Sequence, residues 1–151
     1  MSAVRSVVRP AEARDLTWAR ELLTQASLPT QGLEDQFPRA YAVLEEDGKS
    51  VGLAGLERYG RFGLLRSVAV SPRQRGSGGG SALVSDRLAA AGADGVESVF
   101  LLTTTADRWF PRFGFRPVER ASLPPEIAAS PEASVACPDG AAVLRLDFGP
   151  G

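Results

Sequence analysis

A glycine-rich loop stands at the start of an expected helix, in the stretch SPRQRGSGGGSALVSDRLAA from Ser71 to Ala90. Residues without side chains let a ligand approach backbone N–H groups, and a helix N-terminus adds unpaired N–H groups and the positive end of its dipole. Together these features make a site for an anion, typically a phosphate. Arg73 and Arg75 flank the loop and add positive charge. The alternative is a flexible turn in which glycine supplies positive φ angles.

Two familiar phosphate-binding loops do not fit this stretch. A Walker A loop needs Gly-Lys before Ser or Thr, whereas the only lysine of the chain is Lys49. A Rossmann fingerprint would need a third glycine where Ser81 stands, and an acidic residue at the end of the next strand, Leu101 to Thr104. A nucleotide-binding α/β protein therefore stays an alternative that rests on the glycines alone.

The composition excludes several classes of function. Histidine is absent, which removes Ser-His and Cys-His nucleophiles and nearly all zinc sites, so we expect no metal. A net charge of -1 with 44% hydrophobic residues indicates a globular chain that binds neither nucleic acid nor a membrane. The N-terminus has no apolar signal region, and the single Cys137 cannot form an internal disulfide. These features predict a cytoplasmic protein.

The order of the elements predicts an α/β fold with one mixed sheet and helices on both of its faces. The length of 151 residues suits a single domain, residues 1–151. Asp15 is expected to cap the first helix. Periodicity and turn signals predict strands at Ser6–Arg9, Tyr41–Glu46, Val51–Tyr59, Leu64–Val70, Val96–Thr104, Phe115–Glu119 and Ala142–Phe148, and helices at Leu16–Ala26, Leu33–Phe37, Ser81–Ala91 and Ala106–Phe113. The order is thus β-α-α-βββ-α-β-α-ββ, with a Pro-, Ala- and Ser-rich excursion at Ala121–Gly140.

The glycine loop resembles the acyl-CoA pyrophosphate loop of the GCN5-related N-acetyltransferase (GNAT) superfamily. The residues RQRGSG, Arg73 to Gly78, have the form R/Q-x-x-G-x-G of that loop. Further on, TTTADRWFPRFGFRPVER resembles the signature in which a short helix ends in Gly-Phe, here Gly114-Phe115. The element order is also that of GNAT proteins. LPTQGLEDQF, GLERYGRFGLLRSVAV and LLTTTADRWFPRFGF resemble the branch associated with bacterial arsenic-resistance clusters, which implies a small acceptor.

The resemblance implies an acyltransferase that moves acetyl from acetyl-CoA to a primary amine of a small molecule by direct attack. The cofactor is then expected between the parallel strands Leu64–Val70 and Val96–Thr104. Backbone groups of the first strand would pair with the pantetheine arm, and N–H groups of the loop would hold the pyrophosphate. The residues expected at acetyl-CoA are Val68, Ala69, Val70, Arg73, Gln74, Arg75, Gly76, Ser77, Gly78, Gly79, Gly80, Ser81, Thr103 and Phe110.

Two positions depart from the family pattern and move the expected acid and base. The tyrosine that many members use as general acid is replaced by Phe110, and the glutamate that many carry before the loop is replaced by Arg66. We therefore expect Glu57, on the neighbouring strand, to accept the amine proton directly or through water. Tyr59 would line the acceptor pocket or donate to the thiolate, and Arg66 would bind an anionic group of the acceptor. The alternative is ordinary hairpin-end residues and a solvated Arg66 paired with an acid.

The same departures support a different class of function, a non-catalytic acyl-CoA-binding sensor or partner subunit. Such a protein would keep the cofactor cleft and lack turnover with any acceptor. The resemblance also makes a homodimer possible, with the excursion at Ala121–Gly140 as one candidate contact.

Overall fold

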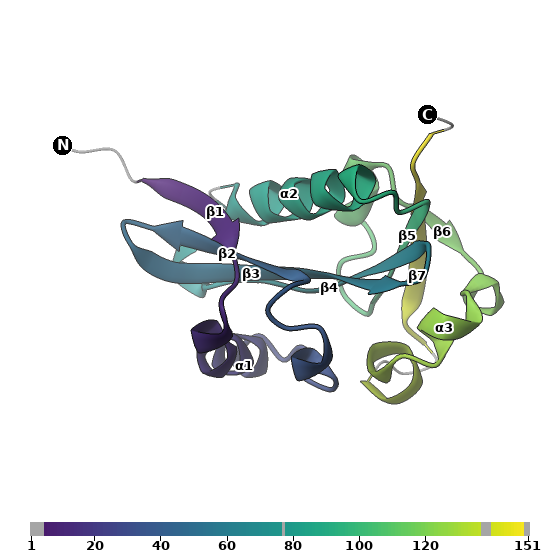
Figure 1. Ribbon diagram of the computed structural model, residues 1–151, viewed down its shortest axis with the longest axis horizontal. Helices are drawn as coiled ribbons and strands as arrows, with labels where there is room; N and C mark the ends of the chain where they lie inside the picture. The colour runs from purple at the N-terminus through teal and green to yellow at the C-terminus, as the bar shows by residue number, and fades with distance from the viewer. Residues whose placement is uncertain (1–4, 77, 137–139, 150–151) are drawn as a thin grey trace.

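The computed structural model describes residues 5–76, 78–136 and 140–149, so Ser77 and Cys137 lie outside the described residues. One mixed sheet has the strand order β1-β2-β3-β4-β5-β7-β6, with helix α2 on one face and helix α1 on the other (Figure 1). The expected fold class is confirmed. The strands are β1 Ser6–Pro10, β2 Tyr41–Glu46, β3 Lys49–Tyr59, β4 Phe62–Val70, β5 Ser98–Thr103, β6 Arg116–Val118 and β7 Ala142–Asp147, and the helices are α1 Leu16–Gln25, α2 Gly79–Ala93 and α3 Pro125–Ala128.

Two of the expected helices are shorter than their patterns predict. The segment Leu33–Phe37 forms only a 3-10 turn at Leu33–Asp35, because so short a segment cannot nucleate an α-helix. The segment Ala106–Phe113 forms only a 3-10 turn at Phe110–Phe113, because Pro111 cannot donate a backbone hydrogen bond. The excursion instead holds α3 and a π-helical turn at Glu132–Ala136.

The expected cap of the first helix is absent, because the Asp15 side chain has other partners. Its carboxylate accepts a hydrogen bond from the Glu12 N–H at 2.7 Å and from both terminal nitrogens of Arg9 at 2.9 and 3.0 Å. No side-chain hydrogen bond caps α1. Asp15 thus joins the start of the helix to strand β1, which holds Arg9.

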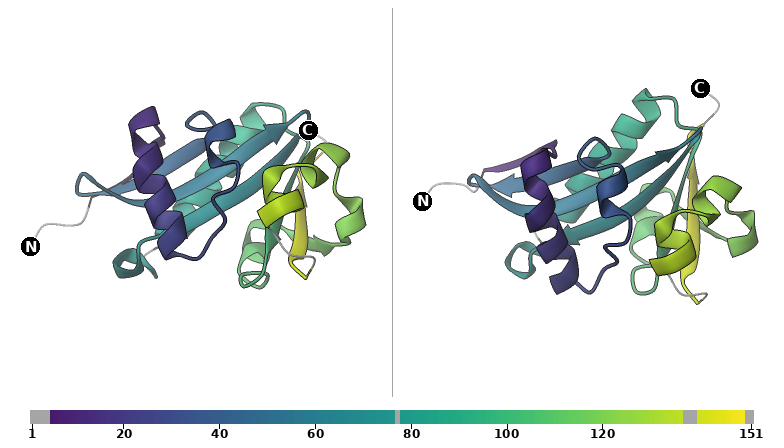
Figure 2. Two further views of the ribbon diagram at one scale, coloured as in Figure 1. Left: turned by 90° about the horizontal axis from the view of Figure 1, so that it is seen from below. Right: turned by 60° about the horizontal axis from the view of Figure 1, so that its bottom comes forward.

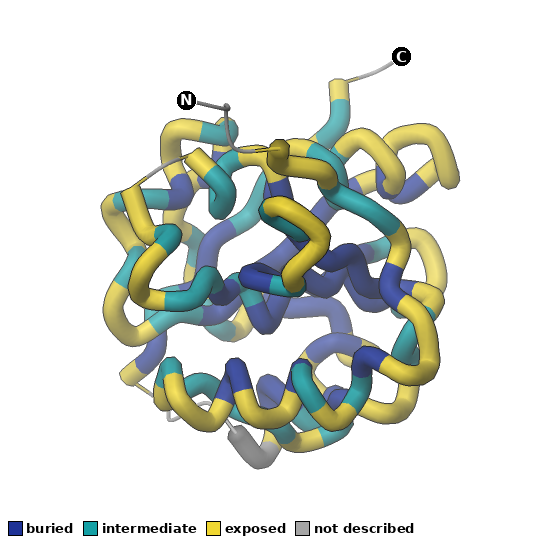
Figure 3. Tube along the Cα trace, turned by 90° about the vertical axis from the view of Figure 1, so that its left-hand side faces the viewer, coloured by how far each residue is buried: buried dark blue, intermediate teal, exposed yellow. Residues whose placement is uncertain are grey.

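Buried positions concentrate along the strands, and exposed positions lie on the outer sides of the helices (Figure 3). Helix α1 lies across one face of the sheet (Figure 2) and buries Ala19, Leu22 and Leu23. Helix α2 covers the opposite face with Leu83, Val84 and Ala91 buried. Each helix is therefore fixed by one apolar face, and the N-terminus of α2 is held beside the end of β4.

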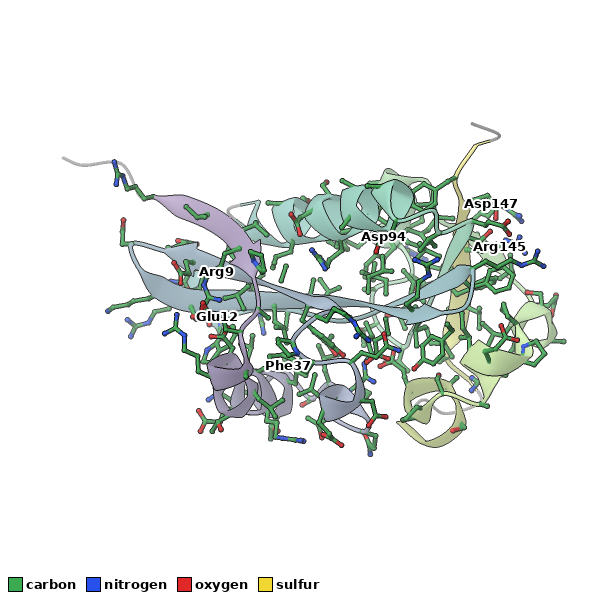
Figure 4. The ribbon with its side chains drawn as sticks, viewed as in Figure 1. Arg9, Glu12, Phe37, Asp94, Arg145 and Asp147 are labelled. Carbon is green, nitrogen blue, oxygen red and sulfur yellow. The ribbon has the colours of Figure 1, made fainter. Side chains whose placement is uncertain are left out.

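The far end of the sheet is joined by polar contacts at Asp147, whose side chain lies beside Arg145 (Figure 4). Its Oδ1 accepts hydrogen bonds from the Ser98 hydroxyl at 2.6 Å and the Arg145 Nε at 2.7 Å, and its Oδ2 accepts one from Arg116 at 3.2 Å. These hydrogen bonds lower the pKa of Asp147 to about 2, and the hydrogen bond from Ser98 has the largest effect. Strands β5, β6 and β7 are thereby joined to one another.

Strands β4 and β5 separate soon after they meet. They pair in parallel only between Phe62–Leu64 and Ser98–Phe100. Beyond this contact β5 pairs with β7 along its whole length, while β4 continues to Val70 with no described strand on that side. Figure 1 shows β7 running steeply across the direction of β4. Backbone N–H and C=O groups on this edge of β4 are left without a strand partner, as at the edge of any sheet.

A β-bulge bends β4 beside this opening. The β3–β4 register shifts between Leu53 and Gly55, and Ser67 on the bulged strand has a φ of 60°. A non-glycine residue in this region costs on the order of 1–3 kcal/mol and is held there by its surroundings, often at a functional site. The strained backbone at Ser67 therefore favours a functional site at the opening between β4 and β5.

Candidate active site

A cleft of about 630 Å³ lies where β4 and β5 separate. One wall is β4 from Leu65 to Val70, and another is the end of β5 from Leu101 to Thr103. The glycine loop and the N-terminus of α2 form one end, and Leu28, Pro29 and Glu132 also line the cleft. Of the cofactor residues expected from the sequence, Val68, Ala69, Val70, Gln74, Arg75, Gly76, Gly78, Gly80, Ser81, Thr103 and Phe110 lie in the lining.

The glycine-loop end of the cleft has the geometry of an anion site. Gly76 and Gly78 have φ values of 87° and 88°, and a Cβ on either would meet no atom within 4 Å. Gly78 is the N-cap of the 15-residue helix α2, whose first N–H groups have no partner within the helix. Arg75 lines the same end, with its Nε donating to the Val70 carbonyl at 3.1 Å. This arrangement suits a phosphate group.

Two of the loop residues expected at the cofactor lie outside the cleft lining. Arg73 is exposed on a 3-10 turn before the loop. Gly79 faces the core, because a Cβ there would lie 2.5 Å from the Leu44 Cδ2. The missing side chain of Gly79 is therefore explained by the close approach of α2 to β2. Ser77 lies outside the described residues.

An aromatic wall adjoins the glycine loop, because a Cβ on Gly80 would lie 3.6 Å from the Trp109 ring. Trp109 and Phe110 line the cleft with their ring centroids 4.9 Å apart, and Phe110 is 7% exposed. Thr103 lies beside them, and its Oγ1 accepts hydrogen bonds from the N–H groups of Thr105 and Ala106 at 3.3 and 3.0 Å. The hydroxyl proton of Thr103 stays available to a ligand, because a hydroxyl can accept and donate at once.

A buried ion cluster lies at the other end of the cleft, where Arg66 and Glu132 belong to the lining and Glu57 lies behind them. The Arg66 side chain is 0% exposed, with its Nε 3.2 Å from the Glu132 Oε1 and its Nη1 3.6 Å from the Glu57 Oε2. Arg66 Nη1 is the one buried side-chain polar atom of the described residues without a hydrogen-bond partner. Burial lowers the pKa of Arg66, but the charges around it, Glu132 first, outweigh this and raise it overall, so the group stays a cation.

The expected role of Arg66, binding an anionic group of the acceptor, stays a prediction. Arg66 is part of the cleft lining, but its guanidinium is paired with the two carboxylates and donates at 3.4 Å to the Pro29 carbonyl, so it is not a free cation. The alternative of a paired arginine fits the contacts, although Arg66 is buried instead of solvated. A carboxylate of an acceptor would have to displace Glu132 to reach it.

Glu57, in contrast to Arg66 and Glu132, lies behind the cleft and outside its lining. The carboxylate is 1% exposed, and its oxygens accept hydrogen bonds from the Tyr41 hydroxyl at 2.7 Å and the Tyr59 hydroxyl at 3.0 Å. With both oxygens occupied, direct proton transfer from a molecule in the cleft does not fit this placement. Burial, and then the charge of Glu57, raises the pKa of both tyrosines, so their hydroxyls stay protonated. Tyr59 is likewise outside the lining, which disfavours it as the acid for a thiolate there.

A glycine on β3 makes room for the contact between Tyr41 and Glu57. A Cβ on Gly55 would lie 2.2 Å from the Tyr41 ring, which packs over this position on the way to Glu57. We expect Gly55→Ala to displace the ring and to lower the free energy of unfolding by about 1–3 kcal/mol, the usual cost of overpacking. Urea unfolding measures this. Gly52→Ala on the same strand should cost less, because its Cβ would approach Leu83 at 3.0 Å, and an equal cost would contradict the account.

Glu132 makes stability depend on pH. Burial raises the pKa of Glu132 to about 7, although Arg66 partly offsets it. A carboxyl group with a raised pKa in the folded state stabilises the fold fully below its unfolded value, near 4.5, and loses that contribution as the pH rises through 7. Compared with Glu132→Gln, we expect the intact protein to lose about 3 kcal/mol between pH 4.5 and pH 7.5. Denaturant unfolding at both pH values measures this, and parallel pH profiles would contradict it.

Sequence reasoning missed two members of the ion cluster. The sequence predicts only that Tyr41 lies in a strand. The one sign of its packing across the sheet is Gly55, which lies opposite it on β3. Glu132 lies in the Pro- and Ala-rich excursion and reaches Arg66 from far along the chain. Its one signal is an acid within the short apolar stretch SPEASVA, from Ser130 to Ala136.

The described residues, 5–76, 78–136 and 140–149, hold no metal-binding cluster and no membrane-spanning helix. Within these ranges, no three side chains of His, Cys, Asp or Glu type gather where they could hold a metal ion. No helix in the same part of the chain has the length and apolar character to cross a membrane.

Comparison with known proteins gives consistent similarities. Residues 38–117 match a family model described as an acetyltransferase (GNAT) domain. The chain is 30% identical over 131 residues to an amino-acid acetyltransferase of Edwardsiella ictaluri, covering 85% of this chain and 28% of that protein. The chain is also 30% identical to the amino-acid acetyltransferase of Photorhabdus laumondii, with 78% of this chain and 28% of that protein covered. It thus spans about a quarter of the length of these curated relatives.

Solved structures show the same fold. The crystal structure of Rv2747 from Mycobacterium tuberculosis, in complex with CoA and NLQ, superposes with a TM-score of 0.79 at 25% identity, covering 94% of this chain and 99% of that one. N-acetylglutamate synthase from Neisseria gonorrhoeae, complexed with coenzyme A and L-arginine, gives a TM-score of 0.79 at 22% identity, covering 95% of this chain and 33% of that one.

Proposed function

Because the chain belongs to the GNAT acetyltransferase family, we propose that it is an acetyl-CoA-dependent N-acetyltransferase that acts on a primary amine of a small molecule. One observation carries the proposal. A single cleft joins the free edge of β4 to a glycine loop at the N-terminus of a long helix. The first feature suits an extended amide chain, and the second suits a phosphate, so the two together fit acetyl-CoA.

The residues that would hold acetyl-CoA follow from the lining. N–H groups around Gly76, Gly78 and Gly80 would bind the pyrophosphate, and the β4 backbone at Val68 and Val70 would pair with the pantetheine amides. When bound, acetyl-CoA supplies the acetyl group as a thioester. The protein would then position the amine against it, and positioning alone contributes roughly 7–11 kcal/mol in ideal intramolecular cases.

The names of the relatives support one chemical class of acceptor. The curated relatives are named amino-acid acetyltransferases, which supports the amine of an amino acid as one candidate. The resemblance to the arsenic-resistance branch supports a small acceptor and stays a prediction. A cytoplasmic location, a bacterial source, a single domain and a homodimer also stay predictions.

The second candidate function is a non-catalytic acyl-CoA-binding sensor or partner subunit. Two observations favour it. Phe110 lines the cleft without a hydroxyl, and the hydroxyl of Tyr59, the other expected acid, donates a hydrogen bond to Glu57 outside the lining. A sensor would bind acetyl-CoA without consuming it.

A thiol-release assay separates the two functions. The protein is mixed with acetyl-CoA and with L-glutamate, L-glutamine, ethanolamine or spermidine, and free thiol is followed by a colorimetric reagent. We expect at least one amine to raise thiol release above the rate without acceptor, with a matching N-acetylated product. Tight acetyl-CoA binding with no acceptor-dependent thiol would favour the sensor.

A further inference from the structure

The ion cluster beside the cleft is unevenly charged, with one guanidinium against two carboxylates. Arg66 is in contact with both Glu57 and Glu132, and its side chain is fully buried. The oxygens of Glu57 are already occupied by two tyrosine hydroxyls. Glu132 differs, because its ion pair with Arg66 is its one polar contact among the described residues, and it lines the cleft. The carboxylate available to a molecule in the cleft is therefore that of Glu132.

The segment that carries Glu132 is held in place by its backbone. The Ser130 hydroxyl donates to the Ile127 carbonyl at 2.6 Å and accepts the Ala133 N–H at 3.3 Å. Arg120 donates at 2.7 Å to the Ala133 carbonyl, and the Ile127 side chain is completely buried. These contacts lie directly on either side of Glu132, so its carboxylate is positioned by a fixed turn.

The loop that carries Pro29 also packs against this segment. Gly32, with a φ of 74°, approaches Pro131 so closely that a Cβ would lie 2.6 Å from the proline Cγ. Leu28 and Pro29 line the cleft next to Arg66. Because the Glu132 side chain is only 5% exposed, a charged group of a ligand would interact with it more strongly than in bulk water.

We propose that Glu132 is the catalytic base of this site, and that it receives the acceptor amine as an ammonium ion and takes a proton from it. The proposal rests on the proposed acetyl transfer and names the residue that prepares the nucleophile. It replaces the direct role expected for Glu57, which becomes a positioning residue that holds Arg66 on the far side.

Acetyl transfer begins with deprotonation of the acceptor ammonium. An ammonium N–H bond breaks, its proton moves to a Glu132 oxygen, and the electron pair stays on nitrogen. The neutral amine attacks the thioester carbonyl carbon, forming the C–N bond, and the C–S bond then breaks with its electron pair on sulfur. A second proton leaves the nitrogen and ends on sulfur, giving the free thiol and the amide. Glu132 returns its proton to water before the next turnover.

The surroundings of Glu132 suit this role near neutral pH. Burial raises the pKa of its carboxyl to about 7, with Arg66 lowering it and Glu57 raising it. The groups that face it are Arg66 from β4 and Glu57 from β3, the latter bonded to Tyr41 and Tyr59. A general base works best when its pKa lies near the working pH.

The test compares the intact protein with Glu132→Gln, and Glu126→Gln is the matched control. Glu126 is an exposed acid on α3, in the same excursion and outside the cleft lining. The readouts are kcat/KM for the best amine of the panel from pH 5 to 9, and the acetyl-CoA Kd. We expect Glu132→Gln to lower kcat/KM by roughly 100-fold or more and to remove the rise near pH 7. The acetyl-CoA Kd should stay within about twofold, and Glu126→Gln should match the intact protein.

Other outcomes overturn the proposal in distinguishable ways. A Glu132→Gln variant that keeps the rise near pH 7 and a rate within threefold of the intact protein would remove Glu132 from the chemistry and leave acetyl transfer standing. No acceptor-dependent thiol from the intact protein would overturn the transferase function, and the base with it. If Glu132→Gln does not fold, Glu132→Asp decides. Because the aspartate carboxylate is one methylene shorter, this variant should keep the pH dependence and react roughly tenfold or more slowly. An unchanged rate would overturn the proposal.

Discussion

Replacing Arg66 with methionine is expected to lower the free energy of unfolding by about 3–5 kcal/mol, because the change leaves two buried carboxylates without their cation. Arg66 is fully buried between Glu57 and Glu132, whose side chains are 1% and 5% exposed. Methionine retains an unbranched side chain and removes the charged guanidinium. Urea unfolding at pH 8 measures it, since Glu132 is then ionised.

Two comparisons make this result specific. Arg61→Met removes an arginine that is 69% exposed and lies 3.4 Å from Glu97, so its cost should stay below about 1 kcal/mol. The double variant Arg66→Met/Glu132→Gln should recover part of the loss, because one of the unpaired charges is then removed. A cost for Arg66→Met no larger than that for Arg61→Met would contradict the buried ion cluster.

Replacing Gly78 with glutamate is expected to weaken acetyl-CoA binding by about 100-fold or more, which corresponds to nearly 3 kcal/mol. Gly78 has a φ of 88°, caps α2 and lines the cleft, and its missing Cβ would point into open space. A carboxylate there would stand at the positive end of the helix dipole, where the pyrophosphate is proposed to bind. Isothermal calorimetry with acetyl-CoA measures the change.

The matched control for this variant is Gly48→Glu. Gly48 has a φ of 80°, also has nothing within 4 Å of its missing Cβ, and lies in the β2–β3 turn outside the cleft lining. Both variants carry the same backbone strain and the same added charge, so only the position differs. Equal acetyl-CoA affinities for the two variants would remove the pyrophosphate from the glycine loop.

The strands and the glycine loop could be predicted from the sequence, because their signals are local. The hairpin signal Asp47-Gly48 predicts the strand β2 at Tyr41–Glu46 and the turn that follows it. The loop residues alone predicted the N-terminus of α2. The predicted lengths of short helices were wrong where local signals compete, as at Phe110–Phe113, where Pro111 limits the helix to one turn.

The polar end of the cleft could not be predicted, because it depends on contacts between distant segments. Glu57 was placed on its strand correctly, but the tyrosine that occupies it reaches across Gly55 from β2. The sequence leaves open whether Arg66 is paired, because its second carboxylate comes from the excursion between β6 and β7. Glu132 is proposed as the base in place of Glu57, because tertiary packing places Glu132 in the cleft lining and Glu57 behind it.

Acetyl-CoA is proposed to bind in the cleft between β4 and β5 with its pyrophosphate at the glycine loop. A calorimetric titration of the intact protein with acetyl-CoA, with NAD as the control nucleotide, tests this directly. We expect saturable binding of one acetyl-CoA per chain and no comparable binding of NAD. No heat with acetyl-CoA, or equal affinity for NAD, would contradict binding of acetyl-CoA at the glycine loop.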